Sequence, residues 1–110
     1  MNKDPKLYLV HIKESIEDIE RYVEGLDMQG FKEDDKTYNA TLRVLQTMSE
    51  SVKRLPDATK SKYPHIEWQD IAGFRNILVH DYLGDYDEHI IWNVIKDKLP
   101  DLKNMAEEEL

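Results

Sequence analysis

The chain has 110 residues, 40% of them hydrophobic and 35% charged, and a formal net charge of −8 at pH 7. We expect one domain over residues 1–110 with a single hydrophobic core, and the acidity argues against a broad surface for binding phosphate groups. The absence of cysteine excludes disulfides, thiolate nucleophiles and cysteine-based zinc sites, and it is typical of a cytoplasmic protein.

The first part of the sequence predicts a long helix over residues 4–26, preceded by no recognisable signal peptide. Asp4 is a candidate N-cap, and Pro5 suits the first helical position. Apolar residues then recur at spacings of three and four, which is one stripe of a helix: Tyr8, Ile12, Ile16, Ile19, Val23 and Leu26. Gly25 and the stretch DMQGFKEDD predict a loop after it.

A second helix is predicted over residues 35–55, where Pro56 ends it. Its apolar face comprises Tyr38, Leu42, Leu45, Met48 or Ser49, Val52 and Leu55. The stretch DATKSKYP, residues 57–64, predicts one more short turn that begins at Asp57.

The remaining sequence predicts a helix from Glu67 or Trp68 to about His80, and another that begins at Asp87 and ends before Pro100. Residues 101–110 predict a frayed last helix. No alternating strand pattern is present, and no segment is apolar enough to cross a membrane, so we expect no membrane partner. The predicted fold class is therefore all-α, a four- to five-helix up-and-down bundle.

The charges are unevenly distributed along the chain. Residues 14–35 hold nine acids against Arg21 and Lys32, whereas residues 53–62 hold Lys53, Arg54, Lys60 and Lys62 against Asp57. A polyanion would therefore have to approach the second region, although both regions are also explained as solvated faces.

A polar cluster interrupts the apolar segment that follows Ile71: Arg75, Asn76, His80, Asp81 and Tyr82. Positions five apart on a helix differ by about 140°, so Arg75 and His80 do not share a face of a regular helix. They converge if the helix ends near His80, or if two copies of the chain meet across a two-fold axis.

The types of these side chains fit the cleavage of RNA without a metal. Arg supplies a permanent charge that suits a phosphate, and His exchanges a proton near neutral pH. The alternative is structural, with Arg75 paired to Asp70 or Glu50 and His80 at a helix C-terminus, where its charge is favoured. No spacing of His, Asp and Glu indicates a metal site.

The stretch WQDIAGFRNILVHDY resembles the signature of the HEPN superfamily, and specifically of its HepT-like branch. That signature contains Arg, a polar residue, three further residues, His, any residue and Tyr, which here are Arg75, Asn76, His80 and Tyr82. The similarity extends to YLVHIKESIEDIERY, to IIWNVIKDKLPDL and to Glu50 in LQTMSES. It covers about residues 8–103 of the chain.

The resemblance implies a HEPN-like homodimer whose two Arg–His motifs line one cleft. It implies a metal-independent endoribonuclease toxin that acts on RNA without a cofactor, with Arg75 and His80 as catalytic pair, Asn76 positioning the phosphate and Glu50 in support. The implied partner is a nucleotidyltransferase antitoxin that adenylylates Tyr82, which would block RNA both sterically and by charge.

Asp81 stands where this branch often has glycine, directly after the motif histidine. A carboxylate there is a further candidate supporting residue, but it also repels the phosphates of RNA. The alternative function is therefore a catalytically weak HEPN module that acts mainly as the binding partner of a nucleotidyltransferase.

Overall fold

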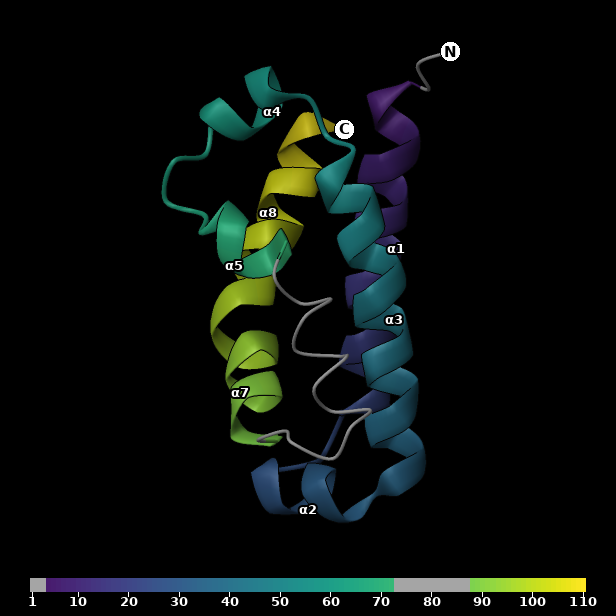
Figure 1. Cartoon of the computed structure of the whole chain (residues 1–110). Helices are drawn as coiled ribbons and strands as arrows, with labels where there is room; N and C mark the ends of the chain where they lie inside the picture. The colour runs from purple at the N-terminus through teal and green to yellow at the C-terminus, as the bar shows by residue number, and fades with distance from the viewer. Residues whose placement is uncertain (1–3, 73–87) are drawn as a thin grey trace.

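The computed structural model describes residues 4–72 and 88–110, and nearly all of them are helical (Figure 1). Helices α1 (Pro5–Tyr22) and α3 (Asp35–Lys53) run side by side in opposite directions, and α8 (Leu99–Glu109) packs against α1. No strand occurs within these described ranges. The predicted all-α bundle is confirmed.

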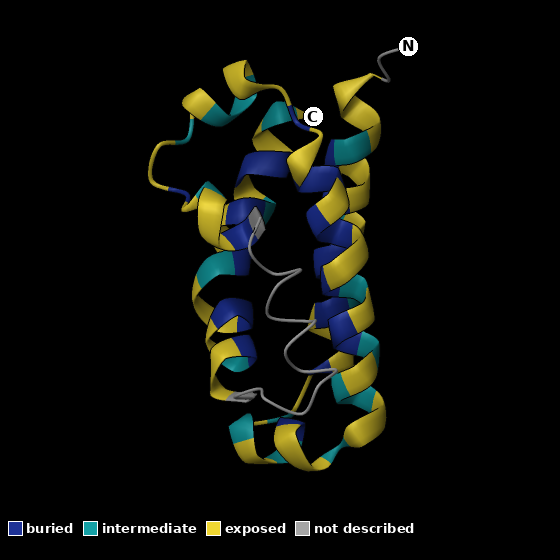
Figure 2. Ribbon diagram, viewed as in Figure 1, coloured by how far each residue is buried: buried dark blue, intermediate teal, exposed yellow. Residues whose placement is uncertain are grey.

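The long helices form where the sequence predicts them, because their caps and apolar stripes agree. The Asp4 carboxylate accepts a hydrogen bond from the backbone N–H of Lys6, with Pro5 in the first turn of α1. The Asp34 carboxylate likewise accepts from the N–H of Thr37 and begins α3. Both stripes face the bundle interior, where buried side chains gather between the helices (Figure 2).

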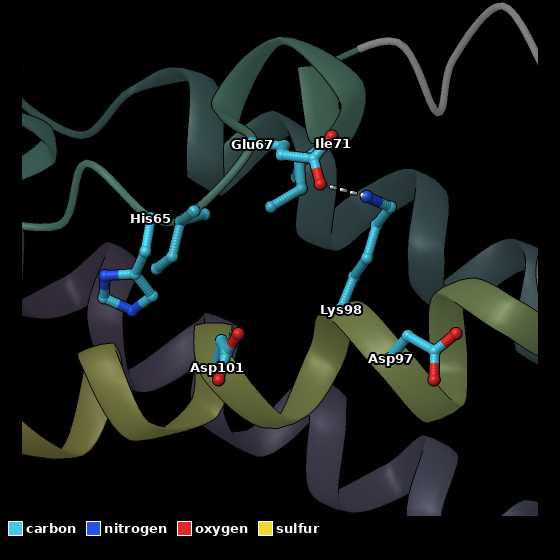
Figure 3. Close-up of a pocket in the computed structure, with 7 residues that line it drawn as sticks. His65, Glu67, Ile71, Asp97, Lys98 and Asp101 are labelled. Atoms are coloured by element: carbon cyan, nitrogen blue, oxygen red, sulfur yellow. Dashed lines mark ion pairs between the residues drawn. The ribbon is translucent and has the colours of Figure 1, made fainter.

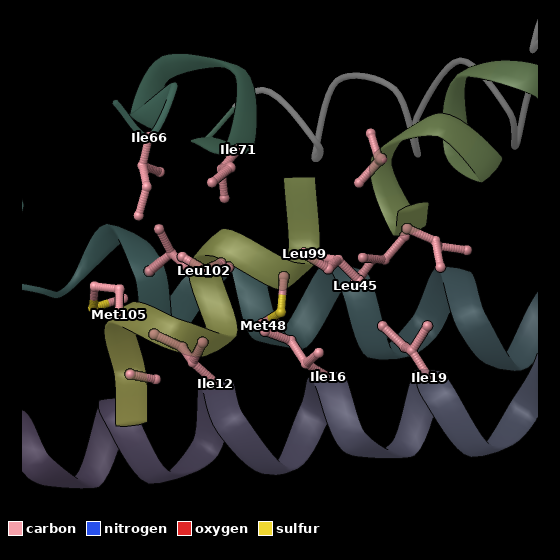
Figure 4. Packing of buried hydrophobic residues seen from close by; sticks show 14 of the residues in the cluster. Ile12, Ile16, Ile19, Leu45, Met48, Ile66, Ile71, Leu99, Leu102 and Met105 are labelled. Atoms are coloured by element: carbon pink, nitrogen blue, oxygen red, sulfur yellow. The ribbon is translucent and has the colours of Figure 1, made fainter. Parts of the chain in front are cut away.

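The core lies where α1, α3, α8 and the short helix α5 (Trp68–Ala72) meet (Figure 4). Its largest fully buried side chains are Phe31, Ile12, Ile16, Ile19, Leu45, Met48, Ile71, Ile91, Leu99, Leu102 and Met105. Burying each such side chain contributes roughly 1.5–3 kcal/mol. In α7 (Glu88–Asn93), Ile91 is buried, whereas its neighbour Ile90 is 45% exposed.

The predicted loop over residues 27–35 contains a short helix, α2 (Met28–Glu33), which corrects the sequence prediction. The carboxylate of Asp27 accepts from the N–H of Gly30 and starts the helix. Phe31 is fully buried, with its ring centroid 5.3 Å from those of Tyr38 and Trp92. The short turn at the other end of the molecule is confirmed as α4 (Asp57–Ser61).

The predicted helix end before Pro100 is wrong. The helix α7 (Glu88–Asn93) continues through one π-helical turn, η1 (Val94–Lys98), directly into α8. Proline fits the first turn of α8 because its missing N–H has no required partner there. Residues 101–110 are not a frayed tail, since Leu102, Met105 and Ala106 are all buried.

Candidate functional site

Most of the predicted site lies outside the described residues: Arg75, Asn76, His80, Asp81 and Tyr82. The structure does describe Glu50 and the two helices that adjoin the motif in sequence. Helix α5 ends three residues before Arg75, and α7 begins six residues after Tyr82. The described structure therefore shows how the two helices that adjoin the motif are held in place.

The start of α5 is fixed by the indole of Trp68. Its Nε1–H donates to the backbone carbonyls of Lys60, at 3.2 Å, and Tyr63, at 3.1 Å. The backbone N–H groups of Asp70 and Ile71 donate to the carbonyl of Glu67, which forms the first turn. These bonds join α5 to the end of α4, so the helix before the motif has a defined starting point.

An ion-pair bridge holds α5 from its other side. The ammonium of Lys98 lies 3.0 Å from Glu67 Oε1, the pair marked in Figure 3. It also lies 3.4 Å from Asp70 Oδ2, so one cation joins two carboxylates. The hydrogen bond to Glu67 is the main reason that the pKa of Lys98 is raised above its ordinary value. Asp70, one of the carboxylates considered for Arg75, is therefore paired with Lys98.

A pocket of about 120 Å³ lies beneath this bridge, between α5 and the η1–α8 junction (Figure 3). Its lining is mixed, with the apolar Ile66 and Ile71 beside polar side chains, namely His65, Glu67, Asp97, Lys98 and Asp101. Within the described part of the chain, no group of three or more His, Asp or Glu residues is arranged to hold a metal ion.

At the other side of the motif, α7 is held by aromatic packing. Trp92 contacts Phe31 of α2, and the ammonium of Lys96 lies 4.8 Å from the centroid of the indole. Contacts between α2 and α7 close this end of the bundle. Both helices that adjoin the motif are therefore fixed to the same core.

Glu50 lies on the solvent-exposed side of α3, between two buried serines. The Ser49 hydroxyl donates to the carbonyl of Gln46, and Ser51 shares a 2.6 Å hydrogen bond with His11 Nδ1 of α1. Glu50 forms no ion pair with any of the described residues. The structure therefore leaves its carboxylate accessible, and its predicted supporting role stays a prediction.

Sequence patterns do not identify Lys98 and Glu67 as residues that hold α5 in place. Lys98 is 28 residues from Asp70 and 31 from Glu67, so no helical spacing could have connected them. The one local signal is the occurrence of two acids, Glu67 and Asp70, at the start of α5. No helix among the residues described is both long and apolar enough to span a membrane.

Comparison with known proteins gives one family match and several relatives. The model of the family described as Ribonuclease HepT-like matches residues 12–109. A provisionally named RNase of Caldanaerobacter subterraneus subsp. tengcongensis is 34% identical over 108 residues, which cover 98% of this chain and 96% of the relative. A provisionally named ribonuclease HepT of Thermococcus cleftensis is 35% identical over 107 residues, covering 97% and 96%.

A longer relative comes from Methanocaldococcus jannaschii, and its name combines a gamma-glutamylcyclotransferase with a provisional RNase. It is 39% identical over 103 residues, which cover 94% of this chain but only 46% of the relative. This chain thus spans less than half the length of that protein. No solved structure gives a significant match.

Proposed function

This chain belongs to the HepT-like ribonuclease family, and on that basis we propose that it is a metal-independent endoribonuclease. The observation that carries the proposal is the family match over residues 12–109, which includes the whole segment from Arg75 to Tyr82. The single HEPN-like domain over residues 1–110 and its cytoplasmic location remain predictions.

In the proposed reaction, the 2′-hydroxyl of RNA attacks the adjacent phosphorus and loses its proton to His80. Arg75 stabilises the negative charge on the phosphorane, and Asn76 positions the phosphate. The bond to the 5′-oxygen then breaks, and this oxygen takes up a proton, which leaves a cyclic phosphate and a 5′-hydroxyl. Glu50 and Asp81 act in support.

The proposed partners are a second copy of the chain and a nucleotidyltransferase antitoxin. The dimer brings two Arg–His motifs to one cleft, and the antitoxin silences the toxin by adenylylating Tyr82. The added AMP fills the cleft, and its phosphate repels the phosphates of RNA. A mass increase of one AMP that is lost in Tyr82→Phe, after coexpression with the nucleotidyltransferase encoded next to this chain, tests this part.

The second candidate function is a catalytically weak module that mainly binds the nucleotidyltransferase. Two observations favour it: the net charge of −8 and the presence of Asp81 beside His80. An Asp81→Gly variant distinguishes the two functions, because it gains RNA cleavage only if the carboxylate suppresses it.

The primary experiment is RNA cleavage in EDTA by protein free of any partner and shown by intact mass to carry no AMP. We expect cleavage by the wild type and its loss in His80→Ala and Arg75→Ala. His65→Ala is the matched control, because His65 is exposed and lies outside the motif. An unmodified dimer that does not cleave RNA, or variants that cleave as well as the wild type, would contradict the proposed activity.

A further inference from the structure

The positive charge of this acidic protein is concentrated on α3 and α4. Residues 36–62 contain six basic and two acidic residues, a net charge of +4, so the rest of the chain carries −12. All of these residues lie in the described part of the structure. A polyanion is therefore repelled by most of the molecule and attracted to this one region.

Three of the cations lie in a row along α3 and its C-cap residue: Lys36, Arg43 and Arg54, here called the basic stripe. Eighteen residues are five whole helical turns, so Lys36 and Arg54 lie on one face, and Arg43 deviates from it by about 20°. The stripe is about 27 Å long, at 1.5 Å per residue. It lies opposite the buried face of α3 that holds Leu45 and Met48, and all three side chains are exposed.

The three stripe cations form no ion pair with a carboxylate among the residues that the structure describes. Arg21, Lys62, Lys98 and Lys103 each form an ion pair with Asp or Glu. The nearest charge effect on the stripe is at its start, where Lys36 is close enough to Asp34 to help lower the pKa of that carboxyl group without forming an ion pair. Lys53 adjoins Arg54 and adds to the charge at that end of the helix.

We propose that the basic stripe of α3 binds the phosphate backbone of the RNA substrate. This inference rests on the proposed ribonuclease function for the identity of the polyanion, but the surface itself is argued from the charges above. Arginine and lysine side chains that follow a strand contact its phosphates without reading the sequence. The stripe would thus hold RNA along α3 while the motif acts on one of its bonds.

The test measures how the binding of a labelled 2′-O-methyl RNA, which cannot be cleaved, depends on salt. We expect the triple variant Lys36→Gln, Arg43→Gln, Arg54→Gln to bind more weakly. The slope of log K against log salt should become shallower by about 2, since each phosphate contact on a single strand contributes roughly 0.7. Glutamine is a good helix former, so α3 is expected to stay intact.

The control changes three other cations that form no ion pair among the described residues, in Lys6→Gln, Lys13→Gln, Lys32→Gln. Both triple variants have the same net charge of −11, which is −8 − 3, so a general charge effect would weaken RNA binding equally in both.

A variant with the opposite expected effect is Glu50→Gln. Glu50 lies within about 40° of the stripe, so removing its negative charge should make the protein bind the RNA more tightly.

Equal salt slopes for the two triple variants, or no RNA binding by the wild type, would overturn the proposal. A stripe variant that binds RNA normally but no longer binds the nucleotidyltransferase would also overturn it, because the stripe would then be a protein-binding surface. Wild-type protein that binds RNA through the stripe but does not cleave a cleavable RNA disproves the ribonuclease function and leaves the stripe standing. Cleavage of RNA together with equal slopes disproves the stripe and leaves the ribonuclease function standing.

Discussion

The ammonium of Lys98 lies 3.0 Å from a carboxylate oxygen of Glu67, and this pair joins the end of the π-helical turn to the residue before α5. The same ammonium lies 3.4 Å from Asp70, inside α5. One lysine thus links the C-terminal helices to the helix that leads into the motif.

Lys98→Met should loosen α5 without unfolding the bundle. Partly exposed ion pairs contribute little, so we expect a melting temperature lower by about 3 °C, together with faster amide hydrogen exchange in residues 68–72. Lys98→Arg keeps the charge and should restore both values. Unchanged exchange in Lys98→Met would show that Trp68 and Ile71 hold the helix without the bridge.

Tyr63 should lose its proton at a higher pH than an ordinary tyrosine does. Its hydroxyl donates to Glu109 Oε2 at 2.8 Å, and partial burial together with this bond raises the pKa of Tyr63 above its ordinary value. Because the folded pKa exceeds the unfolded one, the contribution to stability is present below the ordinary tyrosine pKa and is lost as pH rises. Phenolate absorbance during an alkaline titration measures this.

Glu109→Gln is the matched variant for that titration. It removes the negative charge and weakens the hydrogen bond, so the pKa of Tyr63 should move back toward its ordinary value. Glu107→Gln, on an exposed neighbour without a bond to Tyr63, serves as the control. Identical titration curves in both variants would contradict the assigned cause.

Asp34 should stabilise α3 through its charged carboxylate. Hydrogen bonds from the backbone N–H and hydroxyl of Thr37 lower the pKa of Asp34. A lowered pKa means that the stabilisation is present above the unfolded pKa and is lost as pH falls through the folded one. We expect Asp34→Ala to melt about 5 °C lower at neutral pH, with a smaller difference in acid.

Asp35→Ala is the control for Asp34, because Asp35 is exposed and its side chain makes no capping bond. Thermal unfolding followed by circular dichroism at several pH values measures the melting temperatures of both variants and the wild type. A difference between Asp34→Ala and wild type that stays constant into acid would mean that the carboxylate does not act through its charge.

Leu102→Ala should destabilise the protein strongly, because the C-terminal helix belongs to the core. Leu102 is fully buried in α8, and large-to-small changes at such sites cost about 2–5 kcal/mol. Leu110→Ala removes the same atoms from a residue that is 46% exposed, and should be nearly neutral. Denaturant unfolding of both variants measures the contrast, and equal midpoints would mean that residues 101–110 are frayed after all.

Local spacing determined the elements that depend only on neighbouring residues. The stripes of α1 and α3, their caps at Asp4 and Asp34, and the short turn at Asp57 all follow from residues within a few turns of one another. The resemblance carried by Arg75, Asn76, His80 and Tyr82 predicted the family, which the match over residues 12–109 confirms. The roles of those residues remain predictions, because the structure does not describe them.

Tertiary structure decided what depends on residues far apart in the chain. Residues 28–33 form α2 instead of the expected loop, because Tyr38 and Trp92 give the ring of Phe31 a buried site. The π-helical turn carried the chain through Pro100 into α8, whose buried residues complete the core with α1. Lys98 reaches Glu67, and Tyr63 reaches Glu109, across 31 and 46 positions. A helical period fixes which face of a segment is apolar, but only packing selects the segment that covers it.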